Sequence, residues 1–596
     1  MIKLLIISLV LCLNVSVLQA QVIDHNLLNK RINFQKEKVE EIVELILKDN
    51  IYAFDLWDVV PYNKEIDWTV DPYNNRSWRL YFHSLRMVGC LARAYEFKNE
   101  ADYVRKAMEI ILSWHINRNN SGWDVWTDHA VANRVLNISH LYFVAFSELE
   151  EKDKKLIKDI LNEHGHWLYD DANYTKGNHS IMQDRALMQL ALTFKYKESD
   201  KWYKKGLERI LNTFDEEITS EGVVVENSPA YHPYVMDLLH DFIIMQENFG
   251  KSVPKLYYTR YKDVVNYITY MLKPSGTFPT VGDTYYSSSP FKYLKKYNDE
   301  ELLFVTSKGR EGIIPSHVDK FYPNSGYAIL RDGWKLNGNL EKDTHLFFTN
   351  TNRSVVHKHA DNLSFELFSN GEDLIIDPGH MGYEKDSLSY YLKSTIAHNG
   401  LSIDGILYDV KDIVNTKAEI LNYRSEKNYS SFHAIFSPDS SVTFSRKVLF
   451  IKPNIFVFID DLNLIGQTEY SLYAQTFNFG KSMKSIKQSS EDKVSFDFNN
   501  NTLDIYQLNK VDEFLIYNSE NTYRGKIAAG PLKFRNGVQV VFKRNIYNNS
   551  PEANKFITVF VINNSNSNNL RYTDLKFHFK NNEIKVLKGE KEIPFD

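Results

Sequence analysis

Two histidines separated by one residue, His357 and His359, are followed along the chain by Asp377 and His398. Imidazole and carboxylate groups transfer protons near neutral pH and also bind zinc, so these side chains are suited to either chemistry. From Asp361 on, apolar and polar residues alternate as they do in a half-buried strand. We therefore expect both histidines at or just before the start of a strand, with their rings on one face if the extended conformation already holds there.

The return strand of this hairpin should end near Asp377, after a turn at Asn370-Gly371. A tight turn at that point places Asp377 opposite about Ser364, which is short of His359. The histidine and the aspartate can therefore meet only if the chain before the strand bends back or the turn is offset.

Two further stretches carry side chains with useful chemistry. Gly177-Asn178-His179 lies at the start of a predicted helix, where an amide, an imidazole and unpaired backbone N–H groups can together face an anion. An ordinary N-cap asparagine is the alternative. Tyr231 lies in a proline-containing turn, and its phenol, with an ordinary pKa of about 10, could donate or accept a proton. In a chain with 37 tyrosines, such a residue usually belongs to the core or its rim.

Periodicity divides the chain into a helical half and a strand-rich half. With 596 residues and 43% apolar content, the chain is too long for one ordinary domain. Short loops between amphipathic helices favour antiparallel hairpins arranged as a ring or solenoid. Many short alternating runs after Gly326 imply large stacked antiparallel sheets. The predicted helices cover residues 37–49, 77–98, 101–114, 129–149, 153–168, 179–194, 201–214, 234–249 and 261–272.

The composition restricts where the protein acts and what it binds. Residues 1–20 have an early lysine, an apolar run and a small residue at Ala20, as in a cleaved secretory signal. We expect no membrane span in the mature protein. Cys12 lies in the signal, so Cys90 is alone and cannot form an intramolecular disulfide, which suits a bacterial periplasm or the exterior. The net charge of −5 gives no general attraction to polyanions, so we expect no nucleic acid partner and only a local positive field. The oligomeric state is left open.

Several short motifs occur in order along the chain: Gly177-Asn178-His179, Glu226 to His232, His357-x-His359-x-Asp361-Asn362, Asp377-Pro378-Gly379 and Ala397-His398-Asn399. Together they resemble the heparinase II/III-like polysaccharide lyases, a family that includes heparin, heparan sulfate and some alginate lyases. The resemblance implies an α+β multidomain fold, with an incomplete (α/α) toroid over residues 21–320 and an antiparallel β-sandwich over residues 321–596. It also implies a cleft between the domains and an acidic polysaccharide substrate that contains uronic acid.

The resemblance gives each motif a role in β-elimination, which leaves 4,5-unsaturated uronate ends. This reaction needs a group that neutralises the carboxylate, a base for the C5 proton and an acid for the leaving oxygen. By resemblance, Asn178 neutralises the carboxylate with help from His179. Tyr231 and His357, the latter neutral near pH 7, transfer the protons, and the configuration of the uronate decides which of them is the base.

The resemblance implies that the last three motifs hold one divalent metal, zinc, through His359, Asp377 and His398. The metal has a structural role and braces the strand that carries His357. A hydrogen-bonded cluster without metal is the alternative. The resemblance also places Trp126 and Arg134 in the toroid lining, where the tryptophan could stack on a sugar ring and the arginine could pair with a carboxylate or sulfate. Arg185 is a further candidate for substrate binding, as part of a local basic field. Core packing of the tryptophan and a bridge from Asp128 to Arg134 are equally good explanations.

Two other functions fit the same residues. A metal-dependent glycan hydrolase would use the His359, Asp377 and His398 ion to activate water. A non-catalytic protein of glycan binding or exopolysaccharide assembly would bind uronate polymers without changing them. The lyase prediction is favoured because the sequence contains no paired carboxylates or His-Glu-x-x-His motif, and because Asn178, Tyr231 and His357 are all present. The substrates left open are a glycosaminoglycan such as heparan sulfate or hyaluronan, and alginate.

Overall fold

The structure is a computed structural model of the chain. It describes residues 23–120, 122–286, 297–383, 385–404, 408–465, 472–480, 482–546, 554–564, 569–580 and 583–594. The predicted signal over residues 1–20 lies outside the described residues. The described part of the chain divides into two compact units. The helical unit comprises the described residues up to Glu217 together with Leu238–Pro254, and the sheet unit comprises Ile218–Asp237 and the residues from Lys255 on.

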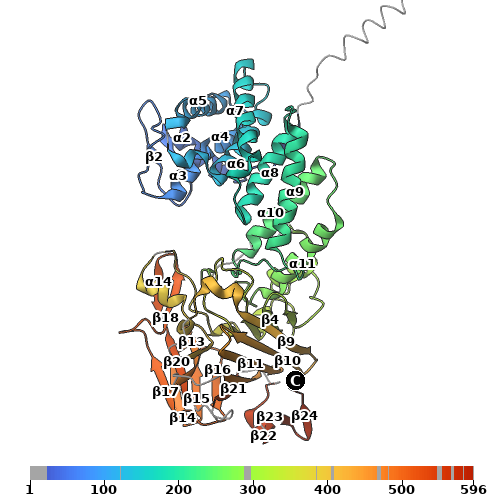
Figure 1. Cartoon of the computed structure of the whole chain (residues 1–596), viewed down its shortest axis with the longest axis vertical. Helices are drawn as coiled ribbons and strands as arrows, with labels where there is room; N and C mark the ends of the chain where they lie inside the picture. The colour runs from blue at the N-terminus through green and yellow to red at the C-terminus, as the bar shows by residue number, and fades with distance from the viewer. Residues whose placement is uncertain are drawn as a thin grey trace, which may run out of the picture. The chain divides into compact units, whose positions relative to one another are not determined.

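The helical unit is built from antiparallel helices joined by short loops (Figure 1, blue to green). A short ladder of β1 (Asn50–Ile51) and β2 (Val60–Pro61) accompanies them. The helix α10 (His232–Asn248) begins in residues grouped with the sheet unit. The other helices are α2 (Lys36–Leu47), α3 (Arg76–His83), α4 (Arg86–Lys98), α5 (Ala101–Asn117), α6 (Asp128–Val144), α7 (Glu151–Tyr169), α8 (Asn178–Thr193) and α9 (Ser199–Glu217).

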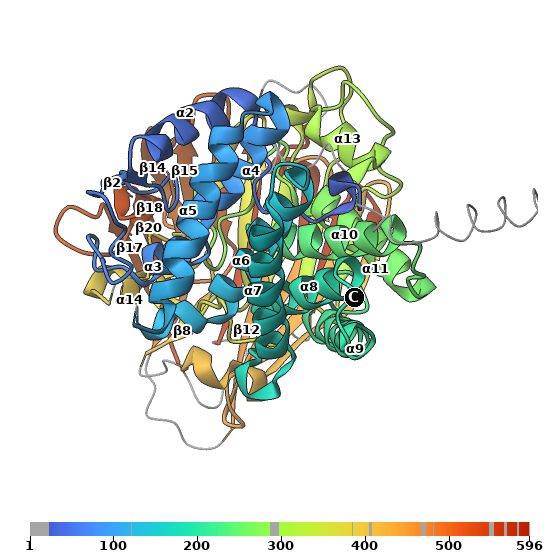
Figure 2. The ribbon, with the colours of Figure 1, turned by 90° about the horizontal axis from the view of Figure 1, so that it is seen from above.

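Neighbouring helices of this unit form two layers. The helices α4, α6 and α8 contact one another in succession, while α5 packs on α4, α7 packs on α6 and α9 packs on α8 (Figure 2). The helix α6 is buried from Ala130 to Phe143, as expected of an inner helix, whereas α5 and α7 each bury one face. The predicted incomplete (α/α) toroid is confirmed.

Each predicted helix has a counterpart in the structure, although α6 ends at Val144 rather than at residue 149 and α11 (Lys255–Met271) begins six residues earlier than predicted. The segment predicted as one helix over residues 77–98 is two helices, α3 and α4, because Leu85 between them has a left-handed backbone with φ of 52°. Leucine rarely adopts this conformation, and no glycine or proline marks the break in the sequence. Local residue preferences therefore could not predict it.

The sheet unit holds the helices α11 (Lys255–Met271), α13 (Glu300–Thr306) and α14 (Ser387–Leu392) and several antiparallel sheets (Figure 1, green to red). Its sheet with eight strands has the order β14-β15-β16-β21-β12-β11-β10-β9, and others have the orders β3-β4-β5-β6-β7, β17-β20-β13-β8, β22-β23-β24 and β18-β19. The strands are β3 (Lys320–Tyr322), β4 (Tyr327–Arg331), β5 (His345–Thr349), β6 (Ser364–Ser369), β7 (Glu372–Ile375), β8 (Leu401–Ile403), β9 (Lys417–Ser425), β10 (Tyr429–Ser437), β11 (Val442–Ile451), β12 (Ile455–Leu464), β13 (Leu472–Phe479), β14 (Ser485–Ser490), β15 (Lys493–Asp497), β16 (Thr502–Gln507), β17 (Glu513–Tyr517), β18 (Lys526–Gly530), β19 (Lys533–Asn536), β20 (Val538–Asn545), β21 (Lys555–Asn563), β22 (Leu575–Lys580), β23 (Glu583–Lys588) and β24 (Lys591–Ile593).

Both faces of the eight-stranded sheet are covered, which makes the β-sandwich. Along β11, Phe450 packs into a core shared with β5, β6, β13 and β20, while its neighbours Leu449 and Ile451 pack on the other face against β22, β23 and β24. This alternation is the period of two that the sequence showed. The predicted β-sandwich is confirmed, while the domain boundary at residue 320 stays a prediction. Among the described residues, no helix is long and apolar enough to cross a membrane.

Candidate functional site

Tyr231 and His357 lie face to face in the sheet unit. Their ring centroids are 3.7 Å apart and their planes are inclined by 21°. The hydroxyl of Tyr383 lies 3.0 Å from the Tyr231 hydroxyl and 3.3 Å from His357 Nδ1. Tyr231 immediately precedes α10, while His357 lies in a turn ahead of β6. The structure therefore brings the two predicted proton-transfer residues together and adds a second phenol that the sequence did not indicate.

The buried carboxylate of Asp283 holds this group in place. Its side chain is only 2% exposed. The carboxylate contacts three imidazoles and one ammonium: His357 Nδ1 at 2.8 Å, His359 Nε2 at 3.0 Å, His380 Nδ1 at 2.9 Å and Lys393 Nζ at 3.3 Å. No sequence motif indicates this role, because 74 positions separate Asp283 from His357 and nothing links the two.

Two carboxylates set the charge of His357. Glu226 Oε2 lies 3.5 Å from His357 Nε2, on the ring nitrogen that Asp283 does not bind. Burial lowers the pKa of His357, but the hydrogen bonds to Asp283 and Glu226 outweigh burial and raise it to about 9. The sequence led us to expect a neutral imidazole near pH 7, and the structure corrects this to an imidazolium. Burial also raises the pKa of Tyr231, so that its phenol keeps its proton.

The backbone around His357 is unusual and is held by Asn227. His357 and Asn227 have φ values of 56° and 54°, in the left-handed region that few non-glycine residues adopt. The Asn227 amide donates to the carbonyls of Ser354 at 2.8 Å and Val356 at 3.0 Å. At Gly282 a Cβ atom would lie 2.5 Å from the Asn227 carbonyl oxygen and 2.8 Å from that of His357. Only glycine fits there, beside Asp283.

His359 and His357 do not share the face of a strand. The strand β6 begins at Ser364, later than the sequence suggested, and both histidines lie in the irregular segment before it. The β6–β7 ladder contains an irregularity between Leu367 and Phe368, and Asp377 lies beyond the end of β7. The sequence required either a bend before the strand or an offset pairing, and the structure has an irregular segment before β6 and a register shift in the β6–β7 ladder.

His359, Asp377 and His398 form a buried group whose ligand atoms lie within 4.8 Å of one another. Asp377 Oδ2 accepts a hydrogen bond from His398 Nδ1 at 2.8 Å. Among the described residues, His359 Nδ1 and His398 Nε2 are buried atoms without a hydrogen-bond partner. Two unpartnered imidazole nitrogens beside a carboxylate fit a divalent cation better than a purely hydrogen-bonded cluster. These residues could hold a metal ion.

A second group with metal-binding side chains shares one histidine with the first. Asp283, His359 and His380 are all buried, and their ligand atoms also lie within 4.8 Å of one another. Burial lowers the pKa of His359, which favours the neutral ring that a metal ligand needs. His359 Nε2 contacts Asp283, which also binds His357. The ring of His359 therefore links the group that it forms with Asp377 and His398 to the proton-transfer residues.

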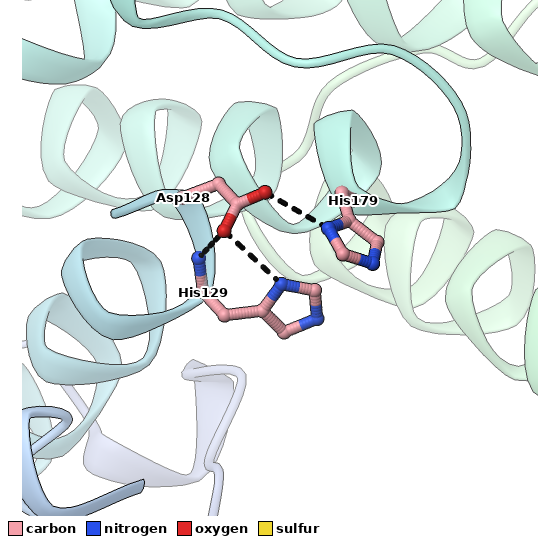
Figure 3. A group of neighbouring side chains, drawn as sticks. All are labelled: Asp128, His129 and His179. Atoms are coloured by element: carbon pink, nitrogen blue, oxygen red, sulfur yellow. Dashed lines mark hydrogen bonds and ion pairs between the residues drawn. The ribbon is translucent and has the colours of Figure 1, made fainter. Parts of the chain in front are cut away.

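Asn178 and His179 begin α8 in the helical unit. The side chain of Asn178 lies outside the described residues, so its neutralising role stays a prediction. The His179 side chain is 52% exposed, and its Nδ1 atom lies 2.8 Å from Asp128 Oδ2 (Figure 3). Asp128 and His129, the first two residues of α6, complete a group that the sequence did not single out.

The structure gives the predicted substrate-binding residues other partners. Arg134 is fully buried, its Nε donates to His164 Nε2 at 2.7 Å, and burial lowers its pKa to about 9. The ring of Trp126 packs 5.1 Å from that of His164. Arg185 donates to Asp241 at 2.9 Å and its side chain is 7% exposed. These contacts favour the packing alternative for Trp126 and Arg134, and Arg134 pairs with His164 rather than with Asp128.

Comparisons with known proteins agree with the fold and with the predicted family. A model described as Heparinase II/III N-terminus matches residues 18–309, and one described as Heparinase II/III-like, C-terminal matches residues 315–555. The chain belongs to the heparinase II/III-like family. The predicted family is thus confirmed over nearly the whole chain.

Curated relatives of this heparinase II/III-like protein are distant. A heparin-sulfate lyase of Pedobacter heparinus is 21% identical over 420 residues, which cover 67% of this chain and 62% of that protein. A heparin-sulfate lyase of Bacteroides thetaiotaomicron is 23% identical over 455 residues, which cover 69% of this chain and 62% of that protein. The matches thus span less than two thirds of the length of these relatives.

Solved structures share the fold of this heparinase II/III-like chain. The crystal structure of a heparan sulfate lyase from Pedobacter heparinus has a TM-score of 0.72 at 18% identity and covers 94% of this chain and 89% of that one. A structure of heparinase III with methylated lysines has a TM-score of 0.77 at 17% identity, with coverages of 95% and 92%. At these identities the likeness establishes the fold.

Proposed function

We propose that the protein is an exported polysaccharide lyase that cleaves a uronic-acid-containing glycan by β-elimination and leaves 4,5-unsaturated uronate ends. The observation that carries the proposal is the stacked pair of Tyr231 and His357, whose ring centroids are 3.7 Å apart and whose imidazole is hydrogen-bonded to the buried Asp283. This pair lies in a chain of the heparinase II/III-like family. A phenol and an imidazole in contact provide the two proton-transfer groups that elimination needs.

Both groups carry their protons in the structure, and this decides how the reaction must begin. The group that acts as base has to pass its proton on before it can remove the C5 proton, while the other delivers a proton to the leaving oxygen. The Tyr383 hydroxyl contacts both Tyr231 and His357, and its side chain is 60% exposed, so it can relay the proton that the base gives up to solvent water. The configuration of the uronate decides which of the two is the base, because the C5 proton lies on opposite faces of the ring in the two epimers.

The remaining roles complete the proposal. Asn178 and His179 neutralise the uronate carboxylate, which makes the C5 proton acidic enough to remove. His359, Asp377 and His398 hold one divalent ion, zinc, which when bound supplies structural bracing for the segment that carries His357. The protein groups, and not the ion, transfer the protons.

The substrate that we propose is a glycosaminoglycan of the heparan sulfate type. The curated relatives named above are heparin-sulfate lyases, and this is the ground for preferring it over hyaluronan or alginate. Such a substrate lies outside the cell, which agrees with the secretory signal predicted over residues 1–20 and with action in a bacterial periplasm or the exterior.

The test is digestion of heparan sulfate, heparin, hyaluronan and alginate, followed by ultraviolet absorbance and by a reducing-end assay. Elimination gives both signals, because the 4,5-double bond is conjugated with the carboxylate. Tyr231→Phe and His357→Gln should each abolish the absorbance, while Tyr390→Phe, which changes a tyrosine that is 64% exposed, should leave it unchanged. New reducing ends without absorbance would instead establish a hydrolase. Binding of the polymer without either signal would establish a glycan-binding protein.

A further inference from the structure

A carboxylate and two imidazoles meet in the helical unit at the starts of α6 and α8. Asp128 Oδ2 lies 2.8 Å from His179 Nδ1, and Asp128 Oδ1 accepts from the His129 backbone N–H at 2.6 Å and lies 3.5 Å from His129 Nδ1 (Figure 3). The two imidazole rings contact each other edge to face, with centroids 4.0 Å apart. Among the described residues, Asp128 is the one polar partner that the structure gives to the His179 ring.

The charge of Asp128 fixes which nitrogen of His179 carries a proton. Burial raises the pKa of Asp128, but the hydrogen bonds from His129 and His179 outweigh burial and hold it well below the ordinary range. An ionised carboxylate accepts hydrogen bonds and donates none. His179 Nδ1 must therefore be the donor, which leaves Nε2 as the ring nitrogen that can contact another molecule.

We propose that Asp128 is the positioning residue of His179: it binds the Nδ1 proton and orients the ring so that Nε2 meets the carboxylate of the sugar acid. This inference rests on the proposed function, in which His179 helps to neutralise that carboxylate. To donate from Nε2 the ring must carry both protons, and Asp128 balances the charge of that form.

The surroundings explain why such a residue is needed. The His179 side chain is 52% exposed, so few packing contacts restrict its ring, whereas the Asp128 side chain is only 13% exposed. Asp128 lies at the start of α6, which is buried from Ala130 to Phe143, and His129 on the same helix packs its ring against that of His179. A rigid inner helix thus positions an exposed ring on α8.

The first test is a double-mutant cycle measured as kcat and KM on the polymer that the protein degrades. Asp128→Asn and His179→Gln should each lower kcat about 10- to 100-fold, as expected for a positioning residue and the residue that it acts through. If Asp128 acts through His179, the double variant should lose no more than His179→Gln alone. Multiplicative losses would overturn the proposal. Asp200→Asn is the matched control, because it removes an exposed carboxylate from the first turn of α9 and should change neither constant.

The second test does not depend on activity. The ¹⁵N spectrum of imidazole-labelled protein, with His179 assigned by comparison with His179→Gln, should show Nδ1 protonated in the wild type and a shift toward the Nε2-protonated tautomer in Asp128→Asn. An identical tautomer in both proteins would overturn the proposal. So would loss of both imidazole signals of His129 and His179 on adding one equivalent of Zn²⁺, which would make the group a metal site. If no polymer is degraded, the proposed function fails while this spectrum still decides the positioning.

Discussion

Two carboxylates of this protein bind imidazoles, and they do so in different surroundings. Asp283 in the sheet unit is 2% exposed and contacts His357, His359, His380 and Lys393. Asp128 in the helical unit is 13% exposed and contacts two imidazoles, one of which is half exposed. A buried charge is stable only when it is fully paired. We therefore expect Asp283 to be needed for the fold as well as for the site, and Asp128 to be needed chiefly to orient one ring.

The largest effect should come from Asp283→Asn. The substitution removes the shared partner of three imidazoles and Lys393, and breaking a buried ion pair from one side costs about 3–5 kcal/mol. We expect the free energy of unfolding, measured by urea denaturation, to fall by about this amount. The matched variant Asp128→Asn should lose less than about 1 kcal/mol because its partners are more exposed. Equal losses from the two variants would show that burial does not separate the two carboxylates.

The next effect is a pH dependence specific to the sheet unit. The pKa of His357 is raised from 6.5 to about 9 in the folded protein, so the folded state holds this proton more tightly than the unfolded state. The resulting stability is fully present below the unfolded pKa of 6.5 and is lost as the pH rises through about 9. It amounts to about 3 kcal/mol. Urea denaturation at about pH 6 and about pH 9.5 should show this loss in the wild type.

The control for that measurement is His357→Gln, which removes the titrating ring. Its stability should change less between the two pH values than that of the wild type, because other groups titrate in both proteins alike. A variant with the same pH dependence as the wild type would contradict the raised pKa of His357.

The third effect concerns the metal ion. His398→Gln removes one of the two imidazole nitrogens of the His359, Asp377 and His398 group that have no hydrogen-bond partner among the described residues, so the protein should lose the proposed zinc ion and about 2 kcal/mol of stability. Metal content and the melting temperature should fall together, and a chelator should have the same effect on the wild type. The control His433→Gln changes a histidine of β10 that is hydrogen-bonded to Ser445 and should keep the metal. Unchanged metal content in His398→Gln would refute the three-ligand site.

The helices and the sandwich could be predicted because they follow from periodic burial. The helical period of α5 and the alternation along β11 are both visible in the sequence, and both decide which face is packed. The break at Leu85 and the left-handed backbone of His357 could not be predicted, because left-handed leucine and histidine residues have no local signature. Tertiary contacts hold these conformations, such as those of Asn227 with the His357 segment.

The candidate site could be predicted only in part, and the reason is the same. His359, Asp377 and His398 have a recognisable set of residue types, and they do lie together. Asp283 has no such signature, since a single aspartate after a glycine occurs in many turns. The neutral form expected for His357 was wrong because the two carboxylates that charge it come from other parts of the chain. Arg134 looked available because a sequence shows charge but not burial.

The smallest predicted effect is a difference in stability between variants of His129, which lies beside Asp128, and of His380, which lies beside Asp283. His129 Nδ1 lies 3.5 Å from Asp128, which is beyond good hydrogen-bond geometry, so His129→Gln should cost only about 0.5 kcal/mol. His380 Nδ1 lies 2.9 Å from Asp283 and its side chain is 1% exposed, so His380→Gln should cost about 1–3 kcal/mol. Urea denaturation of the two variants measures both values. If His129→Gln were as costly as His380→Gln, the edge contact of His129 with His179 would carry a large part of the stability of the helical unit. The orientation of His179 would then depend on packing as much as on the charge of Asp128.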